Sequence, residues 1–250
     1  MGLSDALGSA FNLRLAKALR AKVVLFVEGE DMEVIRALGR RVGAERVVRE
    51  AGIAVIPLIG FDRWEHIEPF QWMAANLLDG AVPVHVFLDR DYKLNEEVDA
   101  VEQRLRAIGV MPHIWARKEL ENYLLIPSAI ARASGTDETE VAGLLEEAIS
   151  TQETDYRANV YGSHRRCAPR RVDDTTVHRD ASAFASAVWA DPQQRVQRCG
   201  GKRALSDLNR LLQALGHKAV TPRRVIGRMR ASEVPAEIRG EILRIDALVS

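Results

Sequence analysis

Residues 23–31 read Val-Val-Leu-Phe-Val-Glu-Gly-Glu-Asp, a wholly apolar run that ends in an acidic turn. An apolar run of this length, without alternating polar residues, is typical of a strand buried on both faces of a parallel sheet. Gly29 permits a tight turn, and apolar residues at helical spacing after it predict a helix over residues 32–43. The stretch therefore predicts the first strand–turn–helix unit of an α/β fold.

The same organisation repeats farther along the chain. The apolar pattern predicts strands at residues 54–58, 82–88 and 111–115, and helices within residues 61–78 and at 95–108. Strands that alternate with helices favour a mainly parallel sheet with right-handed crossovers.

Acidic clusters follow three of these strands. They are Glu28-Gly29-Glu30-Asp31, Asp89-Arg90-Asp91 and Glu119-Leu120-Glu121-Asn122. In an open α/β sheet, ligands bind at the carboxyl ends of the strands. Carboxylates that converge there need a compensating cation, and hard oxygen ligands select Mg²⁺, Mn²⁺ or Ca²⁺. The sequence therefore predicts a metal-dependent site that handles phosphates.

Each cluster also has a purely structural explanation. Asp31 is placed to cap a helix, and Asp is common in the turn after a strand. In extended backbone, however, Asp89 and Asp91 would point the same way and could reach one cation. Glu119 and Glu121 repeat this spacing, although they also suit the solvated start of a helix. The prediction rests on the three clusters together.

Beyond residue 127 the pattern becomes mainly helical. Helices are predicted at residues 128–134, 137–150, 181–190 and 204–215, with two more in the tail. Residues 151–180 show no clear periodicity. No internal repeat is evident.

Charge is balanced overall but segregated along the chain. Lys and Arg together number 35, as do Asp and Glu. Residues 157–179 nevertheless hold six Arg and two His against only Asp173 and Asp174. A basic block of this kind can contact the phosphate backbone without sequence preference, although a solvated loop is the alternative. The candidate nucleic-acid contacts are Arg165, Arg166, Arg170 and Arg171.

The remaining composition points to an ordinary globular protein. The apolar fraction is 47% and the charged fraction 28%. Cys167 and Cys199 lack zinc-ligand spacing and are too few for a disulfide framework. No apolar stretch approaches the roughly 18–20 residues that span a bilayer. We therefore predict a cytoplasmic protein with no membrane contact.

Three motifs resemble the Toprim domain, most closely that of the OLD (overcoming lysogenisation defect) family of nucleases. They are residues 24–31, 88–91 and 117–125, the last reading Arg-Lys-Glu-Leu-Glu-Asn-Tyr-Leu-Leu. The resemblance covers roughly residues 20–127. Gly200-Gly201-Lys202, before a helix, is similar to the Gly-Lys segment that follows the helical insert in OLD-type Toprim regions. The strand-end motifs alone are shared with topoisomerases, primases and small RNases.

The resemblance implies cleavage of DNA by two Mg²⁺ or Mn²⁺ ions. Glu28, Asp89 and Asp91 would ligate the metals, and Asp31, Glu119 and Glu121 would complete the second site. Lys202 would neutralise charge on the reacting phosphate, so the implied catalytic residues are Glu28, Asp89, Asp91 and Lys202. Alanine at either aspartate is expected to abolish cleavage.

The resemblance also implies a domain organisation. It comprises a lead-in helix (1–19), a Toprim core (20–127), a helical, basic insert (128–198) and a return segment with the Gly-Lys loop and C-terminal helices (199–250). OLD proteins carry an N-terminal ATPase, and this chain has no G-x-x-x-x-G-K-[ST] motif. We therefore expect the nuclease region of a longer ATPase-nuclease.

Two alternatives stay open. One is a non-catalytic regulatory α/β module that binds Mg²⁺ in the acidic pocket. The other is a primase-like or topoisomerase-like Toprim protein, although a topoisomerase needs a nucleophilic Tyr in a separate domain.

Overall fold

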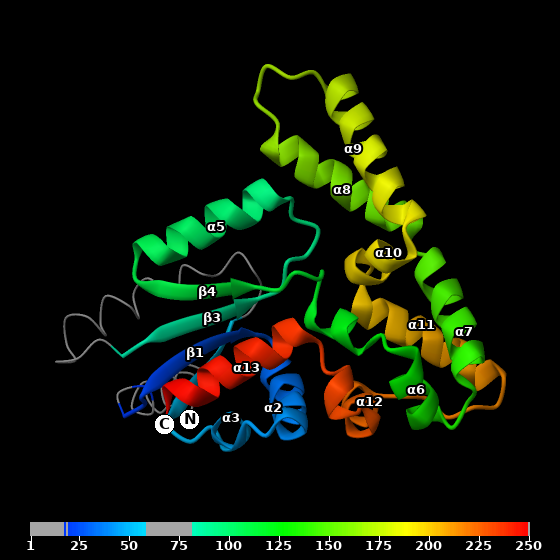
Figure 1. The fold of residues 1–250 in the computed structure, drawn as a ribbon. Coiled ribbons are helices and arrows are strands. Elements are labelled where there is room, and N and C mark those ends of the chain that lie inside the picture. The colour runs from blue at the N-terminus through cyan, green and yellow to red at the C-terminus, as the bar shows by residue number, and fades with distance from the viewer. Residues whose placement is uncertain (1–17, 19, 59–81, 250) are drawn as a thin grey trace, which may run out of the picture. The chain divides into compact units, whose positions relative to one another are not determined.

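A computed structural model describes residue 18, residues 20–58 and residues 82–249 (Figure 1). They group into two compact units. The first comprises Met1–Leu88, Glu102–His113 and Val234–Ser250, and the second comprises Asp89–Val101 and Ile114–Glu233. The helices predicted at 1–19 and within 61–78 lie outside the described residues, apart from residue 18. The division at 20–127, 128–198 and 199–250 stays a prediction.

A four-stranded sheet forms the centre of the first unit. Its strands are β1 (Val23–Glu28), β2 (Ile53–Leu58), β3 (Val84–Leu88) and β4 (Val110–Ile114), in the order β2-β1-β3-β4. Strand β1 pairs in parallel with both β2 and β3, with Val24 opposite Ala54 and Val84. This arrangement confirms the predicted α/β fold with a parallel sheet.

The position of β1 explains its composition. Residues 23–27 are at most 1% exposed, because neighbouring strands cover both edges and packed layers cover both faces. Strand β2 lies at the edge of the described sheet and contains Pro57, which has no N–H to donate to a further strand.

Three helices of the first unit pack together. They are α2 (Asp31–Val42), α3 (Glu45–Arg49) and α13 (Ala236–Leu248), which lies against the other two (Figure 1). The Asp246 carboxylate accepts hydrogen bonds from the backbone N–H groups of Arg46 and Val47, at 2.8 and 2.9 Å. These two hydrogen bonds connect α13 to the start of α3.

Helices dominate the second unit. Helix α5 (Asn95–Ala107) begins in it and ends in the first unit. The others are the 3₁₀ helices η2 (Leu120–Leu124) and η3 (Ala231–Glu233) and the helices α6 (Pro127–Ser134), α7 (Glu138–Ser150), α8 (Glu153–Cys167), α9 (Asp174–Ala190), α10 (Pro192–Arg198), α11 (Gly201–Ala214) and α12 (Pro222–Arg228). Among the described residues, no helix is long and apolar enough to cross a bilayer.

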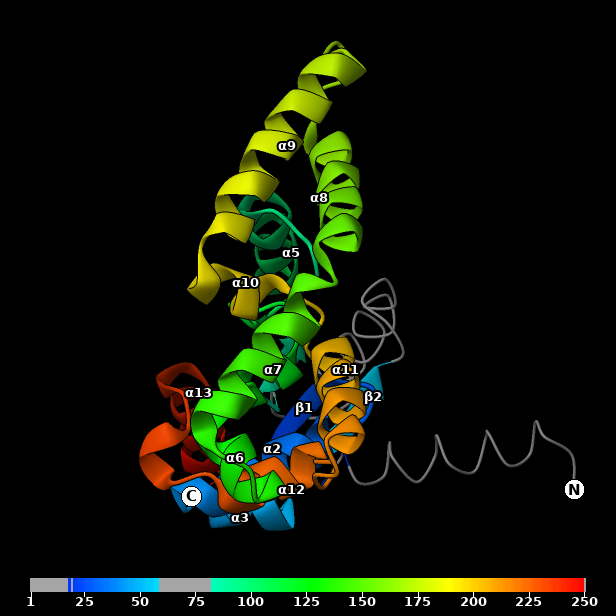
Figure 2. The ribbon, with the colours of Figure 1, turned by 90° about the vertical axis from the view of Figure 1, so that its right-hand side faces the viewer.

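The stretch that lacked periodicity, residues 151–180, forms α8 and the first part of α9. These helices pack side by side in both views (Figures 1 and 2). Only Tyr156, Val160 and Ser163 of α8 are buried, so its apolar stripe is too narrow to stand out in the sequence. The Asp173 carboxylate accepts from the N–H of Thr176 at 3.0 Å, so α9 starts seven residues before Ala181, where the apolar pattern placed it.

Candidate functional site

The first acidic cluster forms the turn between β1 and α2, in the first unit. Glu28 is the last residue of β1, and Asp31, 5% exposed, is the first residue of α2. Gly29 has a φ of +48° and donates its N–H to the Leu58 carbonyl at 2.9 Å. Residues with a side chain rarely adopt this backbone conformation. Glycine therefore allows the tight turn that brings Asp31 close behind Glu28, the last residue of β1.

The second cluster begins directly after β3, in the second unit. Asp89 is 4% exposed, and its Oδ1 accepts a hydrogen bond from the N–H of Leu120 at 3.1 Å. Asp91 has a φ of +54°, so the extended backbone that the two-residue spacing assumed does not continue to Asp91. The turn explanation therefore holds for the backbone here, since Asp is among the residues that tolerate this conformation.

A buried lysine connects the second cluster to the third. Lys118 accepts the Asp91 N–H at its carbonyl oxygen, 2.7 Å away, and its Nζ lies 2.6 Å from Glu119 Oε2 and 4.0 Å from Asp91 Oδ1. Burial alone would lower the pKa of Lys118, but the adjacent Glu119 carboxylate, together with Tyr92 and Asp91, outweighs burial and raises it. Lys118 therefore stays charged and compensates the buried carboxylate of Glu119.

The third cluster, in η2, meets the start of α11. Glu119 Oε1 accepts the backbone N–H of Lys202 at 2.5 Å, where the positive end of a helix dipole favours a carboxylate. Lys202 Nζ lies 3.7 Å from Glu121 Oε2, which is buried and accepts no hydrogen bond. The Lys202 side chain is 60% exposed, so it can also reach a bound anion.

Asn122 joins η2 to the loop between α10 and α11. Its Nδ2 donates to the carbonyls of Val196 and Cys199 at 2.7 and 2.9 Å, and its Oδ1 accepts from the Glu119 N–H at 3.1 Å. The side chain is fully buried. The amide therefore holds η2 against the loop that leads to Lys202.

The structure thus brings together five of the predicted site residues in the second unit: Asp89, Asp91, Glu119, Glu121 and Lys202. Glu28 and Asp31 share the β1–α2 turn of the first unit. The sequence reasoning did not single out Lys118 or Asn122 as site residues. Their position inside the third motif was the only available signal.

The donor chemistry of this cluster suits a divalent cation, although its arrangement does not form a complete site. Carboxylate oxygens are the ligands that Mg²⁺ and Mn²⁺ prefer, and Glu121 offers a buried oxygen without a hydrogen-bond donor. Across residues 20–58 and 82–249, however, no three His, Cys, Asp or Glu side chains are grouped so that they could hold a metal ion. The side-chain ammonium groups beside the described carboxylates belong to Lys93, Lys118 and Lys202.

The pKa of Glu121 leads to a testable pH dependence. Burial raises this pKa, and the charge of Lys202 offsets part of the rise. When a carboxyl has a higher pKa in the folded protein than in the unfolded chain, the folded state holds the proton more tightly. The protein therefore loses stability as the pH rises from the unfolded pKa through the folded pKa. Glu121→Gln is therefore expected to raise the unfolding temperature at neutral pH. Below about pH 4, where the unfolded carboxyl is also largely protonated, the difference from the wild type should vanish.

Thermal melts over that pH range test this expectation. Glu138→Gln, at an exposed position on α7, is the matched control: its carboxylate carries no burial penalty, so this variant should not gain stability at neutral pH. A Glu121→Gln protein less stable than the wild type at neutral pH would contradict the burial penalty.

The four candidate DNA-contacting arginines are all exposed around the end of α8 and the turn into α9. Arg165 pairs with Asp174 at 3.0 Å and Arg166 with Glu97 at 2.9 Å. Arg170 and Arg171 form no ion pair with any described residue. Their charges are therefore the more available of the four for phosphate.

Comparison with known proteins gives one structural likeness. No family model and no curated protein matches the sequence. The solved structure of the C-terminal region of the Xanthomonas campestris pv. campestris OLD protein aligns over 92% of this chain and 96% of its own, with 16% identity and a TM-score of 0.42. It comes from the family that the three sequence motifs resemble. At this identity and TM-score, the likeness transfers no residue role.

Proposed function

We propose that this chain is a metal-dependent endonuclease that cleaves DNA phosphodiester bonds by a two-metal-ion mechanism. The observation that carries the proposal is the cluster in the second unit, where Asp89, Glu119 and Glu121 are buried close to a lysine at the start of a helix. Burying several carboxylates costs free energy, so such a cluster is typical of a functional site.

Under this proposal, the metal ligands in the second unit are Asp89, Asp91, Glu119 and Glu121. Glu28 and Asp31, in the β1–α2 turn of the first unit, stay predicted ligands. When bound, Mg²⁺ or Mn²⁺ would supply an activated water and stabilise the oxygens of the displacement. The chain itself orients the carboxylates through the Leu120 N–H, the Lys202 N–H and Lys118. The exposed ammonium of Lys202 would neutralise charge that develops on the phosphate. An ATPase region acting with the chain stays a prediction.

Cleavage of supercoiled plasmid tests the proposal directly. The purified chain is incubated with plasmid in Mg²⁺, Mn²⁺, Ca²⁺ or EDTA, and nicked and linear products are separated on a gel. We expect cleavage with Mg²⁺ or Mn²⁺ and none in EDTA. Asp91→Asn, purified in the same way, controls for a contaminating nuclease, because Asn also tolerates the left-handed backbone of this position. Metal binding without cleavage would instead favour the regulatory module.

A second prediction concerns how the chain holds DNA. Replacing both Arg170 and Arg171 by Ala is expected to weaken DNA binding equally for unrelated sequences, because phosphate contacts carry no sequence information. The slope of log affinity against log salt should fall by about 2, one unit per lost contact. Replacing Arg165 and Arg166 should weaken binding less, because Asp174 and Glu97 already engage them. Fluorescence anisotropy at several salt concentrations measures both slopes. Equal slopes for the wild type and the Arg170/Arg171 variant would show that these two residues do not contact DNA phosphates.

A further inference from the structure

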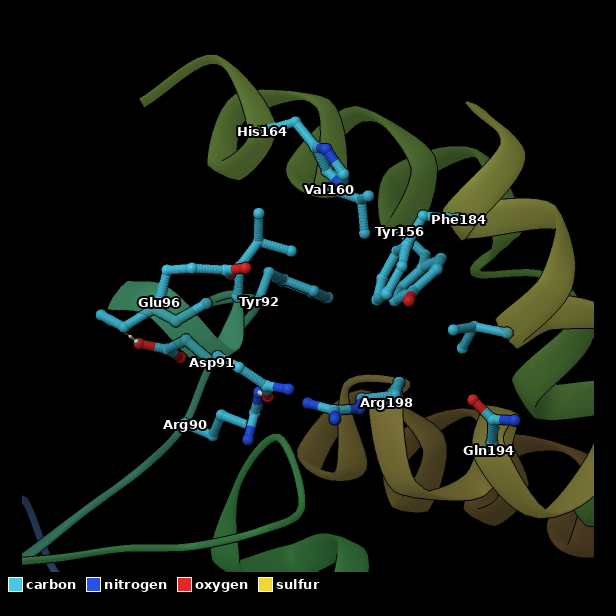
Figure 3. Close-up of a pocket in the computed structure, with 14 residues that line it drawn as sticks. Arg90, Asp91, Tyr92, Glu96, Tyr156, Val160, His164, Phe184, Gln194 and Arg198 are labelled. Atoms are coloured by element: carbon cyan, nitrogen blue, oxygen red, sulfur yellow. Dashed lines mark hydrogen bonds and ion pairs between the residues drawn. The ribbon is translucent and has the colours of Figure 1, made fainter. Parts of the chain in front are cut away.

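The second unit contains a pocket that the proposed cleavage site does not explain. Its volume is about 250 Å³, and it lies between helices α8, α9 and α10 and the segment 90–96 (Figure 3). Asp91, on its wall, also belongs to the acidic cluster. The pocket therefore adjoins the candidate cleavage site.

Two arginines point into this pocket without carboxylate partners. Arg90 is only 9% exposed, donates one hydrogen bond to the Asn95 side chain, and leaves its Nε buried without an acceptor. The side chain of Arg198, at the end of α10, forms no hydrogen bond or ion pair with any described residue. Figure 3 shows the two side chains extending toward one another.

The close approach of these two positive charges is unfavourable. Burial lowers the pKa of Arg90 to about 10, and the charge of Arg198 adds to this effect. Burial likewise lowers the pKa of Arg198. A buried charge without a partner costs free energy, so two facing guanidinium groups are best explained by an anionic ligand.

The carboxylates near the pocket do not supply that anion. Asp91 is engaged by Lys93 at 3.3 Å and by Lys118 at 4.0 Å. Glu96 is exposed to solvent. Asp99 raises the pKa of Arg90, but less than burial and Arg198 lower it. The cationic side of the pocket is therefore left for a ligand.

The opposite wall is aromatic and apolar. Tyr156 stacks on Trp189 with ring centroids 4.9 Å apart, and His164 lies against Phe184 at 5.4 Å. Phe184 is 39% exposed, although large apolar side chains are usually covered. Aromatic rings of this kind stack on nucleic-acid bases.

We propose that the pocket binds a 5′-phosphorylated nucleoside, with the phosphate between Arg90 and Arg198 and the base against Phe184. A terminal phosphate carries a charge of about −1.5 to −2, which matches two guanidinium groups, whereas a phosphodiester carries only one charge. The volume of about 250 Å³ lies just below the roughly 300–1,000 Å³ usual for small-molecule sites, so the ligand is expected to be no larger than a single nucleotide. The ligand is either a free nucleotide or the 5′ end of a DNA strand, and in the second case the inference deepens the proposed nuclease function.

Binding in EDTA tests the proposal without requiring cleavage. The probes are inorganic phosphate, thymidine 5′-monophosphate, and a 12-nucleotide strand labelled at its 3′ end, with and without a 5′-phosphate. We expect the nucleotide to bind and, if the strand end is the ligand, the 5′-phosphate to tighten strand binding by about tenfold through its charge-assisted contacts. Nucleotide binding without this preference supports the free nucleotide as the ligand.

Three variants assign the contacts. Arg198→Ala should abolish nucleotide binding and any 5′-phosphate preference. Phe184→Ala should weaken the nucleotide but leave inorganic phosphate unchanged. Arg223→Ala, at an exposed position on α12, is the matched control and should bind like the wild type.

Two results would overturn the proposal: no nucleotide binding together with no 5′-phosphate preference, or nucleotide binding that Arg198→Ala leaves intact. Because EDTA removes the metals, binding without any cleavage in Mg²⁺ or Mn²⁺ would support the pocket while contradicting the nuclease. Cleavage without nucleotide binding or 5′-phosphate preference would support the nuclease and contradict the proposed ligand of the pocket.

Discussion

Asp89→Asn is expected to leave the fold intact and to reduce metal-dependent plasmid cleavage by about 10²–10³-fold, the size of effect seen when one electrostatic group of a reaction site is removed. Asparagine keeps an oxygen that can accept the Leu120 N–H, which lies 3.1 Å from Asp89 Oδ1. It removes the negative charge and replaces the other carboxylate oxygen by an NH2 donor. The loss of cleavage would then report on the charge and not on the hydrogen bond.

Asp89→Ala is a less selective variant than the sequence alone suggested. It would leave the buried N–H of Leu120 without its acceptor, at a cost of about 1–3 kcal/mol. Cleavage assays of both variants, with circular dichroism and thermal melts of the same preparations, separate the two effects. Wild-type cleavage by a well-folded Asp89→Asn protein in the same metal would contradict the metal-ligand assignment.

Gly201→Ala is expected to cause a large loss of stability. A Cβ at Gly201 would lie 2.6 Å from the backbone N of Asn122 and 3.0 Å from the carbonyl carbon of Glu121. Both are backbone atoms of η2, so neither can move without moving the site. Overpacking of this kind costs about 1–3 kcal/mol. In a chain of this size, each kcal/mol lowers the unfolding temperature by roughly 2–4 °C.

Gly143→Ala is the matched control for this substitution. Gly143 also lies in a helix, α7, and no described atom outside that helix turn lies within 4 Å of the position that an added Cβ would take. Alanine there should stabilise the helix by up to about 1 kcal/mol. Thermal melts and cleavage assays compare the two variants. If Gly201→Ala were as stable and as active as Gly143→Ala, the close approach of α11 to η2 would not be needed for the site.

Local patterns were sufficient for the strands and for most helices. The apolar run at 23–27 and the strand predicted at 82–88 were recognisable because a strand buried on both faces is almost wholly apolar, and His85 is the one polar residue of β3. Helix α8 was missed because Ser163 occupies one of its three buried positions, so burial there does not require an apolar residue. Likewise, Asp91 could be identified as a site candidate, but its left-handed backbone could not.

The sequence by itself determined the α/β fold and the placement of the acidic clusters after the strands, because both depend on residues close together in the chain. Only the tertiary structure decided which groups compensate those acids. Leu120 and Asp89 are 31 positions apart, and Lys202 and Glu119 are 83 positions apart. The facing arginines of the pocket are likewise distant in sequence, since Arg90 follows β3 and Arg198 ends α10. A charge interacts strongly only with groups that lie within a few ångströms of it. Tertiary packing decides which groups these are, and the spacing of residues along the sequence does not.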